Sequence, residues 1–290
     1  MRSINGYTRT CGLLGNPVEH TLSPVIHNFL AEKMGEGFVY VPFRVQEDKL
    51  AEAVKGAFAL NLLGLNVTVP YKSAVIPYLQ ELDPLAERIG AVNTLVRCEK
   101  GFKGYNTDMP GLYRAMCADG VRMEGVKALL LGAGGVAKAA AMLLAQKGAD
   151  SIVILNRTLE RAAQVADTVN QFAGRRIADA MMLTEHERLS RDGKYLAIQA
   201  TNLGMFPDTA GVAVEDESFY DRIDTGYDLI FNPWETKFMK LVKSRGGRAF
   251  NGSKMLLYQG IIAYELWTGR IVEEPLAEAA YQKMMEAMKL

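Results

Sequence analysis

The chain has 290 residues, 49% of them apolar and 23% charged, and its 33 basic side chains balance 33 acidic ones. This composition excludes a disordered, collagen-like or coiled-coil chain and is typical of a globular protein with one large or two medium domains. Because the formal net charge is zero and there are only three histidines, there is no broad basic field for nucleic acid or an anionic membrane, and no histidine-rich metal tract. We therefore expect a small-molecule ligand and no nucleic-acid, membrane or metal partner.

The cysteines indicate the redox compartment. Cys11, Cys98 and Cys117 are odd in number and far apart, which predicts reduced, buried thiols rather than a disulfide framework or a zinc site. We therefore expect a cytoplasmic protein. No apolar run approaches the roughly 18 residues needed to span a bilayer, and the amino terminus lacks the apolar core of a signal peptide. The oligomeric state stays open, with a homodimer as one expectation.

Short β-rich runs alternate with helical patterns in the first half of the chain. Strands are expected at 10–15, 38–45 and 62–70, with helices at 24–34 and 49–60. Pro24 suits the first turn of the first helix, and Gly35 suits its end. Residues 93–108 indicate a hairpin that turns at 99–101, because two alternating runs flank a charged, glycine-containing turn.

A second alternation begins at Lys127, after a linking helix at 109–120. Strands are expected at 128–132, 151–155, 195–200 and 227–231, and helices end near Lys147 and Phe172. The tail is strongly helical at 254–267 and 275–290, and it need not belong to the domain before it. Strands that alternate with helices predict an α/β fold with parallel sheets.

The strongest local signal is the run from residue 128 to 158. An apolar strand leads into Gly132, Gly134 and Ala137 in the G-x-G-x-x-G/A pattern, and a helix and a second strand follow. Glycines at these positions allow a tight turn and the close approach of a pyrophosphate to the free N–H groups of the helix. The sequence therefore predicts a dinucleotide site that includes Gly132, Ala133, Gly134, Gly135, Val136 and Ala137.

The end of the second strand selects the cofactor. Enzymes that use NAD place an acidic residue there to bind the ribose 2′-hydroxyl, whereas this chain has Asn156, Arg157 and Thr158. An amide, a fixed cation and a hydroxyl suit a 2′-phosphate. We therefore expect NADP.

Three further segments place polar residues next to expected strands: 15–28 (GNPVEHTLSPVIHN), 66–72 (NVTVPYK) and 91–108. Together with the glycine turn, the N-R-T at 156–158 and the M-L-x-x-Q-G at 255–260, this order of motifs resembles the shikimate dehydrogenase family over the whole chain. The resemblance implies the reversible, NADPH-dependent reduction of 3-dehydroshikimate to shikimate, a step toward the aromatic amino acids.

The chemistry of that reduction indicates which residues act. A hydride that arrives at a carbonyl carbon leaves an alkoxide, which a nearby ammonium can stabilise and protonate. Lys72 matches the catalytic lysine of the family, and Asp108 matches its partner aspartate. We assign the proton to Lys72 and the orientation of the lysine and of a ring hydroxyl to Asp108, although the sequence alone also allows the reverse.

The resemblance also implies the substrate contacts. Thr21 and Ser23 match two hydroxyls that bind the substrate carboxylate, at an expected helix start that favours an anion. The positions that match polar groups around the ring hydroxyls are Asn66, Thr68, Asn93 and Gln259. His20 and His27 flank the carboxylate loop, and we expect them to be structural imidazoles with hydrogen-bond partners.

The motif order predicts two α/β domains. Residues 1–110 with 251–290 form a substrate-binding catalytic domain with a mainly parallel sheet, and residues 111–250 form a Rossmann-type NADP-binding domain. The active site is expected in the cleft between them, with Gln259 reaching it from the tail.

Three departures from the family pattern bear on substrate choice: Thr21 stands where Ser is common, Phe231 where Tyr is common, and Asn202 where Ser is usual. One alternative is therefore a quinate or dual quinate/shikimate dehydrogenase, which often accepts NAD. An alternative of another class is a non-catalytic module that senses NADP or shikimate, but such a module is expected to lack Lys72 or Asp108, or to carry a DNA-binding extension.

Overall fold

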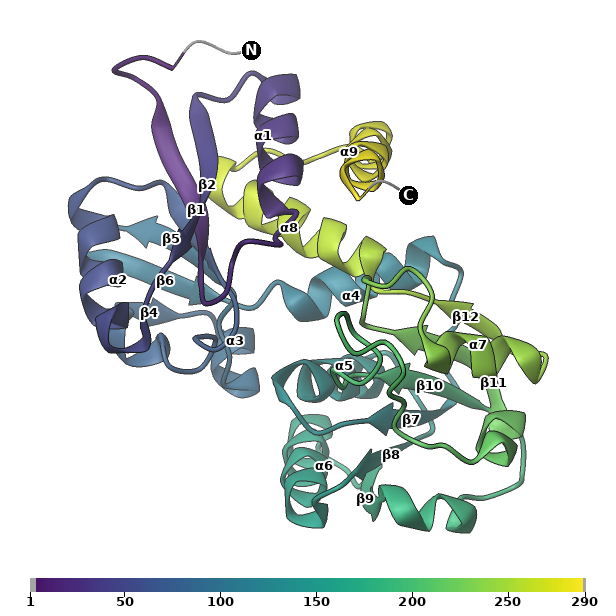
Figure 1. Cartoon of the computed structure of the whole chain (residues 1–290). Helices are drawn as coiled ribbons and strands as arrows, with labels where there is room; N and C mark the ends of the chain where they lie inside the picture. Colours follow the sequence, from purple (N-terminus) through teal and green to yellow (C-terminus); the bar gives the residue numbers. More distant parts are fainter. Residues whose placement is uncertain (1–3, 289–290) are drawn as a thin grey trace. The chain divides into compact units, whose positions relative to one another are not determined.

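The computed structural model describes residues 4–288, and the chain divides into two compact units (Figure 1). Unit 1 comprises Met1–Gly111 and Leu257–Leu290, and unit 2 comprises Leu112–Leu256. The chain crosses between them within helix α4 (Asp108–Ala118) and within helix α8 (Ser253–Thr268). The sequence placed the second crossing at residue 250, but the first turn of α8 belongs to unit 2, where Lys254 donates to Asp119 at 2.6 Å.

Unit 1 contains a six-stranded sheet with the order β2-β1-β3-β5-β6-β4. The strands are β1 (Arg9–Gly15), β2 (Phe38–Arg44), β3 (Gly64–Val67), β4 (Glu81–Leu82), β5 (Thr94–Cys98) and β6 (Gly101–Tyr105). Neighbouring strands are parallel except at β5, which runs antiparallel to β3 and to β6. The expected hairpin is therefore β5–β6, and the sheet is mainly parallel.

Helices cover both faces of the unit 1 sheet. The helices of this unit are α1 (Ser23–Met34), α2 (Leu50–Ala59), α3 (Pro84–Ile89), the unit 1 part of α8, and α9 (Glu274–Ala287), which packs on α1. On one face Leu65 and Val67 of β3 join an apolar core with α2. Since side chains alternate along a strand, Gly64 faces the other side, where the Trp267 indole of α8 lies so close that a Cβ on Gly64 would meet it at 2.1 Å.

Unit 2 contains a six-stranded, wholly parallel sheet with the order β12-β11-β10-β7-β8-β9. The strands are β7 (Lys127–Leu131), β8 (Ser151–Asn156), β9 (Ala178–Met182), β10 (Tyr195–Gln199), β11 (Ile223–Asp228) and β12 (Arg248–Phe250), and the helices are α5 (Gly135–Gln146), α6 (Leu159–Ala173) and α7 (Lys237–Ser244). Short 3-10 turns in the two units lie at Glu47–Lys49, Ile76–Tyr78, Leu183–Arg188 and Glu217–Arg222. The strand order reverses between β7 and β10, and in such sheets ligands bind beyond the carboxyl ends of the strands at this reversal.

The strand expected at 227–231 is misplaced. The structure has β11 at Ile223–Asp228, because the Asp228 carboxylate accepts the backbone N–H of Ile230 at 3.0 Å and turns the chain out of the sheet. Asp224, Thr225 and Gly226 resemble turn residues, although they lie within the strand. The sequence analysis also missed short elements such as α7, whose N-cap residue Thr236 accepts the N–H of Met239.

The cysteines are free thiols, but they are not all buried. Cys11 is buried, Cys98 is half-buried and Cys117 is exposed. The expectation of burial is therefore wrong for Cys117, since α4 turns this side chain toward solvent.

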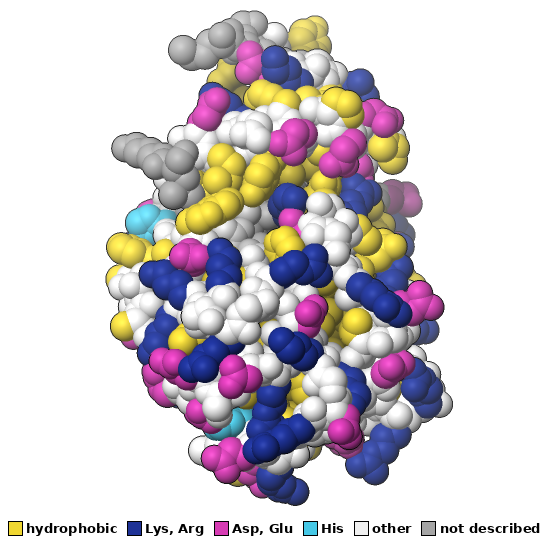
Figure 2. Space-filling model, turned by 90° about the vertical axis from the view of Figure 1, so that its right-hand side faces the viewer, with side chains coloured by type: hydrophobic (Ala, Val, Ile, Leu, Met, Phe, Trp, Pro, Cys, Tyr) yellow, Lys and Arg dark blue, Asp and Glu magenta, His cyan; other side chains and the backbone are white. Residues whose placement is uncertain are grey.

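The surface agrees with the balanced composition. On the face drawn in Figure 2, basic and acidic side chains are interspersed. Elsewhere along the chain, charged side chains form ion pairs such as Arg176 with Asp179 and Lys237 with Glu215. Within residues 4–288, no helix combines the length and the apolar character that crossing a membrane requires.

Asp228 is a buried carboxylate at the end of β11. Thr236 donates to its Oδ2 at 2.6 Å, and the backbone of Ile230 donates to its Oδ1. Burial raises the pKa of Asp228 to about 7, although the two hydrogen bonds lower it in part. The side chain therefore holds a proton in the folded protein at pH values where an unfolded chain would release it.

We predict that Asp228 makes the folded protein less stable as the pH rises from about 4 to about 7. In this window the folded state binds more protons than the unfolded state, so the free energy of unfolding falls by up to about 1.4 kcal/mol per pH unit. Asp228→Asn removes this slope and keeps the side-chain shape. Thermal unfolding of both proteins between pH 5 and pH 8 measures the difference, and parallel curves would contradict the prediction.

Candidate active site

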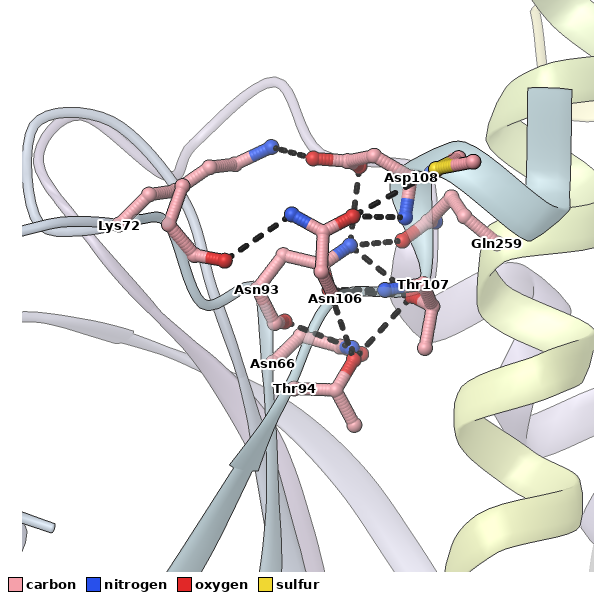
Figure 3. Close-up of polar contacts among 10 residues, drawn as sticks. Asn66, Lys72, Asn93, Thr94, Asn106, Thr107, Asp108 and Gln259 are labelled. Carbon is pink, nitrogen blue, oxygen red and sulfur yellow. Dashed lines mark hydrogen bonds and ion pairs between the residues drawn. The ribbon is translucent and has the colours of Figure 1, made fainter. Parts of the chain in front are cut away.

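The centre of the candidate site is an ion pair in unit 1. The Lys72 ammonium donates to Asp108 Oδ2 at 2.7 Å (Figure 3), and the two side chains are 25% and 8% exposed. Lys72 lies beyond the end of β3, and its backbone carbonyl accepts the N–H of Val92 at 2.7 Å. Asp108 begins α4, where Asn106 Oδ1 accepts the N–H groups of Asp108 and Met109 and so caps the helix.

Asn93 orients Asp108. Its Nδ2 donates to Asp108 Oδ1 and to Thr107 Oγ1, both at 2.9 Å, and approaches Gln259 Oε1 at 3.4 Å. Its Oδ1 accepts the backbone N–H of Thr107 at 2.7 Å and the Thr94 hydroxyl at 3.2 Å. Because these contacts engage both ends of the amide, Asn93 holds Asp108 with one oxygen toward itself and the other toward Lys72.

Asn66 is equally constrained. Its Nδ2 donates to the backbone carbonyl of Asn93 at 3.3 Å and to Thr94 Oγ1 at 3.1 Å, and its Oδ1 accepts the Tyr40 phenol at 2.8 Å. The amide of Asn66 thus retains acceptor capacity on Oδ1 but no unused N–H. Thr68 lies one residue beyond the end of β3, where its methyl group packs so close to Gly15 that a Cβ on Gly15 would meet it at 2.3 Å.

Thr21 and Ser23 lie together at the start of α1. The Thr21 hydroxyl donates to Ser23 Oγ at 3.2 Å and accepts the backbone N–H of Ser23 at the same distance. Ser23 is buried and Thr21 is half-buried. Leu22, the N-cap residue, makes no side-chain cap, but its carbonyl accepts the N–H groups of Val25 and Ile26, and Pro24 has no N–H. The groups of this helix start that can turn to an outside acceptor are therefore the hydroxyls of Thr21 and Ser23.

Gln259 reaches Asn93 because α8 packs closely on α4 at Gly111. A Cβ on Gly111 would lie 2.7 Å from the backbone nitrogen of Gln259 and 2.8 Å from its Cα. Only glycine allows this approach, so the tail helix brings a side chain from residue 259 to a cluster built by residues 66–108.

The glycine turn in unit 2 has the geometry of a phosphate cradle. Gly132 has φ = 114°, and a Cβ there would meet Thr201 Cγ2 at 2.9 Å. Ala133 follows, and Gly134 is the N-cap of α5, with open space where its side chain would be and no side-chain cap for the helix. Gly135, Val136 and Ala137 form the first turn of α5, whose N–H groups are therefore available to an anion.

The residues after β8 lie at the same edge of the sheet. Asn156 ends the strand, and its Nδ2 donates to the backbone carbonyl of Thr158 at 2.9 Å. Thr158 is the N-cap of α6 but makes no side-chain cap. Arg157 lies between them and is exposed. This edge therefore presents a guanidinium and a hydroxyl that the fold itself does not use for capping.

The sequence analysis missed several residues of this cluster. Thr94, Asn106 and Thr107 stand within the motifs that carry the family resemblance, so their position beside Asn93 and Asp108 was a usable signal. No sequence signal marked Tyr40, because it lies in an apolar strand.

The expectation for His27 is wrong in part: it is fully buried, yet neither of its ring nitrogens has a hydrogen-bond partner among the described residues.

Comparisons with known proteins identify the family of this chain. Residues 13–95 match the family model described as the shikimate dehydrogenase substrate binding domain, and residues 116–187 match the model described as shikimate / quinate 5-dehydrogenase. The protein named shikimate dehydrogenase (NADP(+)) in Desulforamulus reducens is 43% identical over 272 residues, covering 92% of each chain. The chain belongs to the shikimate dehydrogenase family.

Solved structures of the family share the fold. A shikimate dehydrogenase in complex with NADP+ has a TM-score of 0.90 at 34% identity, covering 98% of this chain and 97% of that one. A quinate dehydrogenase from Corynebacterium glutamicum in complex with NAD has a TM-score of 0.86 at 27% identity, covering 96% and 99%. The higher identity to shikimate dehydrogenases favours the first of the two enzyme alternatives.

The departures from the family pattern leave the Lys72–Asp108 ion pair intact. Thr21 keeps its hydroxyl beside Ser23. Phe231 is half-buried in the loop after β11, and Asn202 is exposed in the turn after β10. Neither residue belongs to the cluster around Asn93.

We predict that Gly111→Ala destabilises unit 1 and weakens the site. The added methyl forces α8 away from α4, which costs about 1–3 kcal/mol and withdraws Gln259 from Asn93. Thermal unfolding and the KM for shikimate measure the two effects. Gly56→Ala is the matched control, since nothing lies within 4 Å of a Cβ there and a glycine replaced inside a helix gains about 1 kcal/mol. If both variants keep the wild-type KM, the close approach has no role in the site.

Proposed function

We propose that this chain is an NADP-dependent shikimate dehydrogenase that reversibly reduces 3-dehydroshikimate to shikimate. In this proposal unit 1 binds the substrate and unit 2 binds the cofactor. The observation that carries it is the Lys72–Asp108 pair, held by Asn93, in a chain whose second unit has an NADP-type glycine turn. The activity belongs to the synthesis of aromatic amino acids.

Lys72 supplies the proton. During reduction, negative charge develops on the carbonyl oxygen, and the ammonium stabilises it and transfers a proton to it. Asp108 holds Lys72 in place through Oδ2 and accepts a hydrogen bond from a neighbouring ring hydroxyl. In the reverse direction Lys72 takes the proton from the alcohol.

The remaining substrate groups meet neutral side chains. Thr21 and Ser23 bind the carboxylate through their hydroxyl groups at the start of α1. The side chains that bind ring hydroxyls are Asn66, through Oδ1, Thr68, Gln259 and Asn93. Asn93 also orients Asp108. Hydroxyls and amides both donate and accept, which suits a ring that carries several hydroxyls.

The residues of unit 2 fit NADP. The first turn of α5, with Gly132 to Ala137, holds the pyrophosphate, and Arg157 with Asn156 and Thr158 holds the 2′-phosphate. When bound, NADPH supplies the hydride.

The cell compartment and the assembly are part of the proposal. The free thiols suit a reducing compartment, and we propose a cytoplasmic enzyme. We propose a homodimer that does not bind nucleic acid, in keeping with the zero net charge.

Initial rates with four substrate pairs test the activity. We expect shikimate with NADP to give the highest kcat/KM, at least tenfold above shikimate with NAD and above quinate with either cofactor.

Arg157→Gln is expected to raise the KM for NADP about tenfold or more, because a charge-assisted contact to a phosphate contributes about 1.5–3 kcal/mol. The KM for NAD stays unchanged, since NAD has no 2′-phosphate.

Two results would contradict this proposal. Better use of quinate with NAD would identify a quinate dehydrogenase. Binding of shikimate or NADP without turnover would identify a sensing module.

Lys72→Met tests the proton transfer. We expect kcat to fall about 100-fold or more while the dissociation constant of shikimate changes little, because the lysine acts mainly in the transition state. Stopped-flow and steady-state rates measure kcat, and calorimetric titration measures binding. Lys55→Met, which removes an exposed lysine on α2, is the matched control. Near-normal turnover of the Lys72 variant would exclude Lys72 as the proton donor.

A further inference from the structure

One buried tyrosine supports a side chain of the candidate substrate site. Tyr40 of β2 is only 1% exposed, and its phenol donates to Asn66 Oδ1 at 2.8 Å. Burial raises the pKa of Tyr40 well above its usual value, and the Ser23 side chain lowers it only in part. The phenol therefore keeps the proton that it donates to Asn66.

The backbone of Tyr40 is held by α1. Asn28 Nδ2 donates to the Tyr40 carbonyl at 2.9 Å, and Asn28 Oδ1 accepts the Tyr40 N–H at 2.8 Å. Since β2 is an edge strand, these two groups have no strand partner on that side, and the Asn28 amide takes the place of one. The position of Tyr40 along the strand is thereby fixed to the helix that begins with Ser23.

The ring of Tyr40 is held by His27. The two rings stack with centroids 4.3 Å apart and planes 15° apart, and Trp267 lies on His27 at 5.0 Å. Burial lowers the pKa of His27 to about 3, which the nearby Asn66 side chain offsets only in part, so the imidazole is neutral. Because neither ring nitrogen has a described partner, His27 acts here as a flat wall for the phenol rather than as a proton carrier.

We propose that Tyr40 is a positioning residue for substrate binding, an inference that rests on the proposed function. Its phenol fixes the orientation of the Asn66 carboxamide, so that the subsite for the ring hydroxyls is set before the substrate arrives. Asn28 and His27 hold Tyr40 in that place.

The physical basis is the symmetry of an amide. The oxygen and nitrogen ends of a carboxamide have nearly the same shape, so only hydrogen-bond partners decide which end faces the substrate. Two acceptors hold the Asn66 nitrogen, and the Tyr40 phenol holds the oxygen. Without the phenol, substrate binding has to order this amide, and the binding free energy is smaller by that cost.

Tyr40→Phe tests the inference, because it removes one oxygen and keeps the ring. We expect calorimetric titration of the NADP-free protein to show a dissociation constant for shikimate about fivefold higher, as the loss of one buried hydrogen bond implies. The KM for NADP is expected to stay within twofold of the wild type. Tyr220→Phe is the matched control: that phenol is also buried and donates to Val214 at 2.7 Å, but it lies in unit 2. This control loses a similar bond without weakening shikimate binding.

A double-mutant cycle separates positioning from a general loss of structure. If Tyr40 acts through Asn66, then Tyr40→Phe weakens shikimate binding by less than twofold in an Asn66→Ala background, because the amide that it orients is gone. Purely structural damage would instead multiply with the loss of Asn66.

The outcomes are distinct. A wild-type protein that neither binds nor oxidises shikimate overturns the proposed function and this inference with it. Two outcomes overturn the positioning role alone, provided that the wild-type protein binds shikimate. In one, the Tyr40→Phe variant binds shikimate as well as the wild type does. In the other, the effects of Tyr40→Phe and Asn66→Ala multiply in the double mutant.

Discussion

The Lys72–Asp108 ion pair depends on one buried carboxamide, that of Asn93. A buried amide is costly unless its donors and acceptor are all engaged, and Asn93 satisfies them with groups from β5, from the segment before α4 and from α8. The same bonds that satisfy Asn93 determine which oxygen of Asp108 faces Lys72. One side chain therefore meets two requirements: it pairs the buried polar groups, and it orients the lysine.

This arrangement explains why the tail of the chain returns to unit 1. The hairpin β5–β6 and the start of α4 supply Asn93 and Asp108, but Gln259 comes from α8. The Gly111 contact shows that the return is a close packing of two helix backbones, since even a methyl group there would meet the backbone of Gln259. A site assembled from such distant segments exists only when unit 1 is completely folded.

Much of the fold followed from local patterns, and the failures have local causes. The strands and helices with strong periodicity, such as α1 with Pro24 and Gly35 or β7 with its apolar run, agree with the structure. β11 was misplaced because Asp224, Thr225 and Gly226 resemble a turn, whereas the burial of Thr225 and Gly226 depends on strands that lie far away in sequence. The site residues came from motifs, and Lys72, Asp108, Asn93 and Gln259 do meet in the structure. Tyr40 could not be found in this way, since its phenol acquires a role only when β2 lies beside α1.

The neutral charge of the chain is compatible with the two anion sites that we propose, which differ in construction. At the exposed edge of unit 2, Arg157 can carry a permanent charge because water solvates it when no phosphate is bound. At the start of α1, where Ser23 is buried, an unpaired guanidinium would be expensive to desolvate. Hydroxyls avoid this cost: in the free protein the Thr21 hydroxyl donates to Ser23 Oγ and accepts the backbone N–H of Ser23. Since a hydroxyl rotates at little cost, Thr21 and Ser23 can turn their hydroxyl protons to an arriving carboxylate, while the Tyr40 phenol keeps its bond to Asn66. The proposed carboxylate site thus needs no charge of its own.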